Sequence, residues 1–174
     1  MGHPLGRGRI LRSSDGDRWE TAVLLDWDCA DVREPKLSVT AEDMLMVNTS
    51  LKFVSREPRE GSDAGYEAGA KYYRLDEPKT KPNDEEKNVT RQSATWLSED
   101  GQTWSSAFCC PTGINTWRWE VAWHNGMGYS IGYDGKDGAG TLYRTRDGKS
   151  WRVLKTDLFP DGHGNEGSIA FDAD

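Results

Sequence analysis

Short runs of alternating apolar and polar residues, separated by turn-forming residues, extend along most of this chain. Residues 36–40 and 44–48 alternate on the two sides of a three-residue link, a pattern that predicts a β-hairpin. No stretch of ten or more residues shows the apolar period of an amphipathic helix. The hydrophobic pattern therefore predicts an all-β chain.

A second hairpin is expected farther along the chain. Residues 120–123 resemble a strand and precede the Asn-Gly dipeptide at 125–126, which is a strong two-residue turn signal. After this turn, Tyr129, Ile131 and Tyr133 alternate with small residues, as in a half-buried strand. The strands are expected to be short and separated by tight turns.

One turn-like pattern occurs three times: Ser or Thr, any residue, Asp, Gly, two further residues and Trp. An Asp carboxylate can accept hydrogen bonds from the amides that follow it, and Gly adopts a positive φ without steric cost. The hydroxyl can close the same loop, and the Trp can pack against a neighbouring sheet. We interpret the pattern as a stabiliser of hairpins, so its Asp residues are predicted to be structural and not catalytic. The shared positions are Ser13, Asp15, Gly16, Trp19, Ser98, Asp100, Gly101, Trp104, Thr145, Asp147, Gly148 and Trp151.

The spacing of these turns predicts a repeated architecture. Asp100 and Asp147 are 47 residues apart, close to the period of roughly 40 to 50 residues of a four-stranded propeller blade. Asp15 and Asp100 are 85 apart, but residues 54–89 are polar, charged and rich in Gly and Pro, and we interpret them as a loop insertion of 36 residues. Without the insertion the spacing is 49. The expected blade boundaries are 1–24, 25–111, 112–156 and the start of a further blade at 157–174.

Composition restricts the partners. The formal net charge of -7 and the dispersed Lys and Arg residues argue against nucleic acid or an anionic membrane surface. The first nine residues contain no apolar run, so neither a signal peptide nor a membrane span is expected. The compartment stays undetermined, because a longer parent protein with an export signal, secreted or periplasmic, is left open.

The cysteines and acidic clusters predict no metal or cofactor. Cys29 and the adjacent Cys109 and Cys110 form no disulfide framework, and no CxxC or His pair offers a zinc site. We interpret them as packed thiols. Three aspartates between positions 26 and 31 suggest calcium as an alternative, but the Gly and the terminal Glu of an EF-hand loop are missing. A solvated loop is the preferred interpretation.

The repeated turns resemble the Asp boxes (BNR repeats) of the sialidase, or neuraminidase, superfamily, in a form one residue shorter than usual. Further segments resemble successive landmarks of bacterial exo-α-sialidase-like proteins, namely 33–40, 44–46, 98–104, 119–126, 142–144 and 165–166. The resemblance implies a six-bladed β-propeller with its active site at the centre of one face. At the blade period above, 174 residues less the 36-residue insertion account for about three blades, so the chain resembles a partial propeller.

The resemblance also implies site residues. Glu166 matches the Glu that polarises a nucleophilic Tyr in sialidases, and Arg33 with Glu34 matches an Arg-Asp pair that lines the substrate pocket. Arg118 and Trp119 are expected at the rim of that pocket. Each residue also has a purely structural alternative. Glu166 would be an exposed loop carboxylate, and Arg33 and Glu34 would form an ion-paired blade edge. Trp119 would be a packed Trp beside a solvated Arg118.

Three departures from the family pattern bear on activity. Arg7 stands where the general acid/base Asp is expected, and a guanidinium cannot donate a proton near neutral pH. Glu34 replaces an Asp, and Glu120 replaces an Arg. Neither the nucleophilic Tyr nor most of the Arg triad has a match in the chain.

Two functions follow as hypotheses. The chain is either a fragment of a sialidase-like glycoside hydrolase that releases terminal sialic acid or a related sugar, inactive by itself, or a non-catalytic Asp-box propeller that binds a glycan or a protein. Uncovered flanks of the outermost blades would also favour self-association.

Overall fold

The computed structural model describes residues 6–27, 30–53, 71–74, 91–133, 138–162 and 166–172, with the backbone alone at 53 and 71–74. Every helix or strand in these ranges is a β-strand, which confirms the all-β prediction. Across the same ranges, no helix is available to span a membrane. The strands are β1 (Gly8–Arg12), β2 (Glu20–Asp26), β3 (Ala30–Val39), β4 (Leu45–Phe53), β5 (Lys71–Arg74), β6 (Arg91–Ser98), β7 (Phe108–Ile114), β8 (Trp117–Arg118), β9 (Ala122–His124), β10 (Met127–Tyr133), β11 (Thr141–Thr145) and β12 (Trp151–Lys155).

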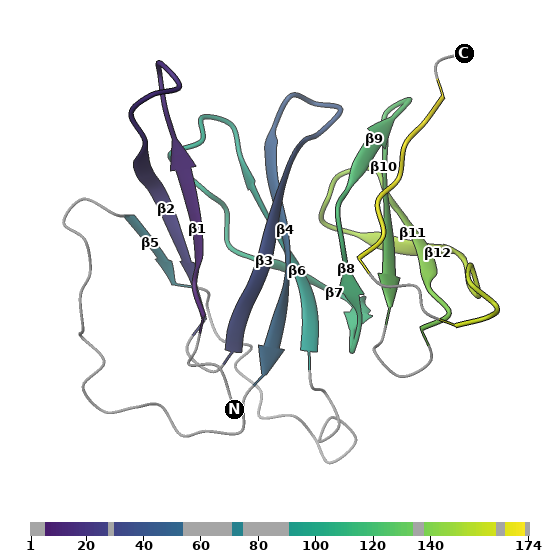
Figure 1. Ribbon diagram of the computed structural model, residues 1–174. Helices are drawn as coiled ribbons and strands as arrows, with labels where there is room; N and C mark the ends of the chain where they lie inside the picture. Colours follow the sequence, from purple (N-terminus) through teal and green to yellow (C-terminus); the bar gives the residue numbers. More distant parts are fainter. Residues whose placement is uncertain are drawn as a thin grey trace.

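The strands form three sheets that stand side by side (Figure 1). Sheet A contains β1, β2 and β5, sheet B has the order β3-β4-β6-β7, and sheet C has the order β12-β11-β10-β8 with β9 also paired to β10. Sheets B and C are antiparallel throughout, whereas β5 pairs parallel to β2. Because β5 lies inside residues 54–89, the prediction of a loop there missed one strand. The rest of that range lies outside the described residues.

Sheet B is packed on both faces. Val47 and Trp96 belong to a core shared with sheet A, whereas Met46 and Leu97 belong to a core shared with sheet C. Successive side chains of a strand point to opposite faces, so neighbours on β4 and β6 contribute to different cores. For this reason β6 is buried along nearly its whole length.

The face of sheet B toward sheet C carries buried polar side chains. Thr95 Oγ1 donates a hydrogen bond to the carbonyl of Gly148 at 2.6 Å, and Ser93 Oγ donates to the carbonyl of Thr116 at 2.5 Å. Asn48 bonds to two further carbonyls beside β8. Buried polar groups are tolerated when they are hydrogen-bonded, so these contacts connect the two sheets while satisfying the polar atoms.

Both predicted hairpins are present. β3 and β4 pair antiparallel around the link that follows Val39. β9 and β10 pair around Asn125 and Gly126, both of which have positive φ. On β10 the small residues form the buried face, and a Cβ added at Gly132 would lie 2.9 Å from the Tyr143 ring. Tyr129, on the other face, is half-buried and contacts Phe171 at a ring distance of 5.2 Å.

The three box turns share one set of hydrogen bonds. One carboxylate oxygen of each Asp accepts from the amides two and three residues later, at 2.6–2.9 Å. The Ser or Thr hydroxyl accepts from the Gly amide at 2.8–2.9 Å. The Trp indole donates to the Gly carbonyl at 2.9–3.3 Å. Each Gly has a φ between 68° and 82°.

The box Trp residues differ in burial. Trp104 is 3% exposed and belongs to the core between sheets A and B, and Trp151 is 4% exposed and belongs to the core between sheets B and C. Each of these residues thus packs toward the sheet that precedes its own. Trp19 of sheet A is 61% exposed, because no described sheet precedes it.

Gly148→Ala is expected to destabilise the chain more than Gly16→Ala. Both substitutions force Ala into a positive φ, which costs about 1–2 kcal/mol. At Gly16 nothing lies within 4 Å of the added Cβ, whereas at Gly148 it would lie 2.6 Å from the sulfur of the fully buried Met46. This overlap adds about 1–3 kcal/mol. Guanidinium unfolding of the two variants checks the order, and equal losses would contradict the packing of this turn against sheet B.

Acid should weaken the fold through the box turns. Backbone hydrogen bonds lower the pKa of Asp100 from 3.8 to about 2, and they lower the pKa of Asp15 as well. Because this pKa is depressed, the ionised carboxylate stabilises the folded state above pH 4, and this stabilisation is lost as pH falls toward about 2. Asp100→Asn should therefore reduce the loss of stability over that window, as measured by unfolding midpoints. Glu42→Gln controls for the change in charge, because Glu42 is an exposed carboxylate outside the box turns. An identical dependence of stability on pH in both variants would contradict this prediction.

Candidate functional site

The candidate site is an aromatic stack formed by Trp117, Trp119 and Tyr133. The two Trp residues are two positions apart, so their side chains leave the strand on the same side. Their rings are nearly parallel, with centroids 5.0 Å apart and planes at 8°. Tyr133 pairs with Trp117 across the β8–β10 ladder, and its ring centroid lies 6.1 and 6.2 Å from those of the indoles. The three rings form one apolar group where β8 meets the end of β10.

Two cations flank the aromatic stack. Lys36 Nζ lies 5.3 Å from the Trp119 ring centroid, and Arg91 Cζ lies 5.8 Å from that of Trp117. Both distances are within the range of a cation–π attraction. Lys36 belongs to β3 and Arg91 to β6, so the site combines side chains from sheets B and C. A ligand in contact with the stack would meet positive charge at both ends.

Two carboxylates also act on the stack. Burial raises the pKa of Tyr133, and Glu166 and Glu34 raise it further, whereas Trp119 and Arg91 lower it. The contact with the Trp119 indole falls short of full hydrogen-bond geometry. Because the net pKa is raised, the phenol is protonated at neutral pH and is not an activated nucleophile. Of the predicted site residues, Trp119 belongs to the stack but is only 4% exposed, whereas Glu34 and Glu166 act on Tyr133 only through their charge.

Sheet B holds the backbone beneath the stack. Asn48 Nδ2 donates to the carbonyls of Arg118 and Trp119 at 2.7 and 2.5 Å. The Arg118 amide donates to Ser93 Oγ at 2.9 Å. These groups are buried, so the bonds are shielded from competition by water. They fix the position from which the two indoles project.

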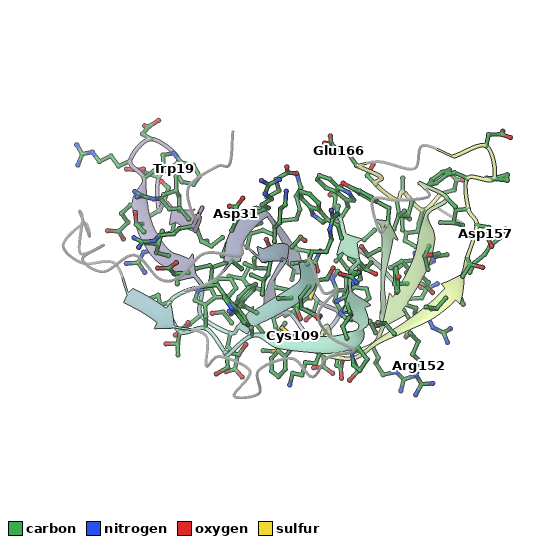
Figure 2. All side chains as sticks on the ribbon, turned by 90° about the horizontal axis from the view of Figure 1, so that it is seen from below. Trp19, Asp31, Cys109, Arg152, Asp157 and Glu166 are labelled. Atoms are coloured by element: carbon green, nitrogen blue, oxygen red, sulfur yellow. The ribbon has the colours of Figure 1, made fainter. Side chains whose placement is uncertain are left out.

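The predicted residues Arg33 and Glu34 lie on β3. Arg33 Nε is 2.6 Å from Asp31 Oδ2, and the other oxygen of Asp31 accepts from the Gly6 amide at 3.0 Å. Glu34 is exposed, with a φ of 49°, where the β3–β4 register is interrupted. Figure 2 shows Asp31 and Glu166 toward one long side of the molecule and Cys109 toward the other. Arg33 thus has an ion-pair partner already, whereas Glu34 is exposed to solvent.

Arg118 lies inside the protein, away from the rim at which the sequence placed it. The residue is 1% exposed and sits between sheets B and C. Its guanidinium carbon is 4.7 Å from the Trp151 ring centroid and 5.6 Å from that of Tyr143. Alternation along β8 explains the difference, because Arg118 points opposite to the two Trp residues. Its expected contact with a substrate stays a prediction, and the geometry gives it no open path to one.

The remaining residues singled out in the sequence lie outside the aromatic stack or outside the described residues. Arg7, which occupies the expected acid/base position, pairs with Asp26 at 3.0 Å. Glu120 is exposed. Asp28 of the acidic cluster and Asn165 beside Glu166 lie outside the described residues. Among the residues that are described, no three His, Cys, Asp or Glu side chains gather as a metal site.

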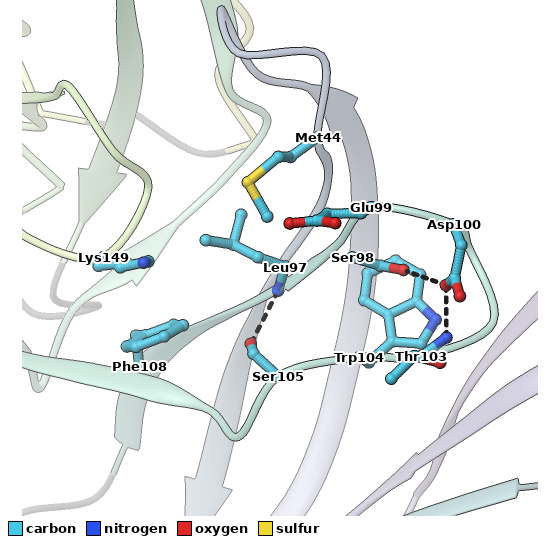
Figure 3. A pocket seen from close by; sticks show the side chains of 10 residues that line it. All are labelled: Met44, Leu97, Ser98, Glu99, Asp100, Thr103, Trp104, Ser105, Phe108 and Lys149. Carbon is cyan, nitrogen blue, oxygen red and sulfur yellow. Dashed lines mark hydrogen bonds between the residues drawn. The ribbon is translucent and has the colours of Figure 1, made fainter.

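A separate pocket of about 450 Å³ lies beside the second box turn (Figure 3). Met44, Leu97 and Phe108 supply apolar lining, and Lys149 lies 5.1 Å from the Phe108 ring centroid. The Asp100 carboxylate in this pocket already accepts the hydrogen bonds of its own turn. None of the lining residues belongs to the aromatic stack, so we place the candidate site at the stack.

No protein-family model matches the chain, and no curated protein matches it significantly. Function must therefore be argued from the geometry. The sequence prediction named Trp119, whose 4% exposure agrees with the alternative of a packed Trp, and it missed Trp117, Tyr133 and Arg91. The available signal was the Trp-x-Trp spacing, which places two indoles on one side of a strand, together with a Tyr at the end of the next alternating segment.

Asn48→Ala is expected to destabilise the chain by about 2 kcal/mol, because it removes the buried amide that donates to the carbonyls of both Arg118 and Trp119. Ser50→Ala is a matched control, since Ser50 lies on the same face of β4 and its hydroxyl has no hydrogen-bond partner among the described residues. This second substitution should leave the free energy of unfolding unchanged or raise it. Guanidinium unfolding followed by Trp fluorescence measures both. A loss at Ser50 equal to that at Asn48 would contradict the support role of the amide.

Proposed function

We propose that the chain is part of a sialidase-like Asp-box propeller and supplies about three of its six blades. Sheets B and C support this assignment, because in each the box turn joins the last two strands, β6–β7 or β11–β12. Sheet A has a box turn between β1 and β2, as the end of a first blade would. The face-to-face packing of the three sheets through two separate cores also supports it.

Within that architecture, we propose that this chain binds a glycan at the aromatic stack. The stack of Trp117, Trp119 and Tyr133 between Lys36 and Arg91 is the observation that carries the proposal. The apolar C–H faces of a sugar ring pack against indole rings, whose π faces are electron-rich. Cations at both ends favour a sugar that carries a carboxylate, and a terminal sialic acid meets both requirements.

Hydrolysis by this chain alone is not expected. Glu166, which is exposed, remains the residue proposed to polarise a nucleophile. However, the pKa of Tyr133 is raised, and Arg7 pairs with Asp26 where an acid/base group is required. A glycosidase would need blades beyond those described. The binding function does not depend on them.

Exposed apolar side chains at the outer sheets support the further proposal of self-association. They include Leu11 and Trp19 on sheet A, and Val153 and Leu154 on sheet C. Faces that neighbouring blades would otherwise cover are expected to seek a partner. Sedimentation at several concentrations would measure this tendency.

Binding is tested by titrating the 174-residue chain with sialyllactose and with lactose. Sialyllactose should bind more tightly than lactose, and Trp117→Ala should weaken it by about tenfold, or roughly 1.4 kcal/mol. Trp19→Ala, which removes an exposed indole outside the stack, should leave the affinity unchanged. Equal affinity of the Trp117→Ala variant and the parent, or no binding of either sugar, would overturn the proposal.

A further inference from the structure

Two neighbouring cysteines on β7 have different surroundings. Cys109 is exposed, whereas Cys110 is half-buried and packs against the core between sheets B and C. Adjacent residues of a strand point to opposite faces, so only one of the two thiols faces sheet C. Exposure alone would make Cys109 the more reactive thiol.

Hydrogen-bond donors converge on the sulfur of Cys110. Arg118 Nη1 lies 3.7 Å from this sulfur, and Thr112 Oγ1 lies 3.2 Å from it. Thr112 Oγ1 donates to the Trp151 carbonyl at 3.1 Å, and a charged sulfur would offer its proton a second acceptor. This set of donors is suited to an anionic sulfur.

Arg118 lacks the anion that a buried guanidinium requires. Its Nε and Nη2 have no hydrogen-bond partner within the described part of the chain. No described carboxylate pairs with it, and the ionisable groups that act on it are Cys110, Tyr143 and Cys109. An uncompensated buried charge is strongly unfavourable, and among these groups only the sulfur of Cys110 contacts the guanidinium as a hydrogen-bond acceptor.

We propose that Cys110 is a thiolate paired with Arg118 and that it is a site of oxidation by hydroperoxides. The thiolate sulfur attacks one oxygen of hydrogen peroxide, an S–O bond forms, and the O–O bond breaks. The sulfur is oxidised by two electrons, and the peroxide is reduced to hydroxide, which takes a proton from solvent or buffer. The resulting sulfenic acid oxygen is an acceptor for the unpartnered N–H groups of Arg118.

The electrostatics of the two thiols agree with this assignment. Burial opposes ionisation of Cys110, but Arg118, Thr112 and the Trp151 amide outweigh it and lower the pKa of this thiol. Although Cys109 as a residue is exposed, desolvation of its thiol, with the neighbouring Cys110, raises its pKa to about 11. The charge of Arg118 from β8 favours ionisation of both thiols, although its guanidinium contacts only the sulfur of Cys110, and Tyr143 from β11 acts on Arg118.

The experiment measures alkylation of each cysteine by iodoacetamide in the full chain between pH 6 and 11, with peptide mapping to separate Cys29. At pH 7.5, Cys110 should react at least about tenfold faster than Cys109, because a larger thiolate fraction outweighs the lower intrinsic nucleophilicity. After exposure to hydrogen peroxide, dimedone should label Cys110 and not Cys109. Equal rates, a faster Cys109, or no dimedone adduct on Cys110 would overturn the proposal.

Two substitutions of Thr112, which lies beside Cys110, distinguish an effect on thiol reactivity from an effect on folding. Thr112→Val removes one donor and should slow alkylation of Cys110 several-fold, while Thr112→Ser should restore the rate. Alkylation of Cys109 should be the same in both variants, and unfolding midpoints confirm that both are folded. A rate at Cys110 that is unchanged in the Val variant would contradict the role of the converging donors.

Discussion

The burial of sheet B on both faces is the constraint on which the rest of the structure depends. A sheet with two buried faces has to pair most of the polar side chains that it carries without water. Asn48, Ser93 and Thr95 meet this requirement by hydrogen bonds to backbone atoms of sheet C. Because these bonds reach β8 and the third box turn, the packing of two sheets also sets the position of the aromatic stack.

The local structure was largely predictable from sequence. The box turns and the Asn-Gly hairpin follow from residues that supply positive φ or accept nearby amide protons, so their conformations depend on few long-range contacts. β5 was missed because its parallel pairing with β2 joins segments far apart in the chain, and no local pattern reports such pairing.

The candidate site was predictable only in part. Trp119 and Glu166 came from a family resemblance, but the stack with Trp117 and Tyr133 arises from pairing between β8 and β10. Arg118 was placed at a rim, whereas strand alternation turns it into the interface. Adjacent positions on β8 therefore have different roles: Trp117 is a proposed ligand contact, whereas Arg118 is a buried cation. The same alternation places Cys110 beside that cation.

We propose that the aromatic stack contacts a sialylated glycan. The most direct measurement is the set of Trp indole N–H resonances of the chain during titration with an α-sialoside. We expect the signal of Trp117 to shift, and that of Trp119, which is only 4% exposed, to shift less, while those of Trp19 and Trp151 stay in place. Shifts confined to Trp104, which lines the separate pocket, or no shift at any indole, would contradict it.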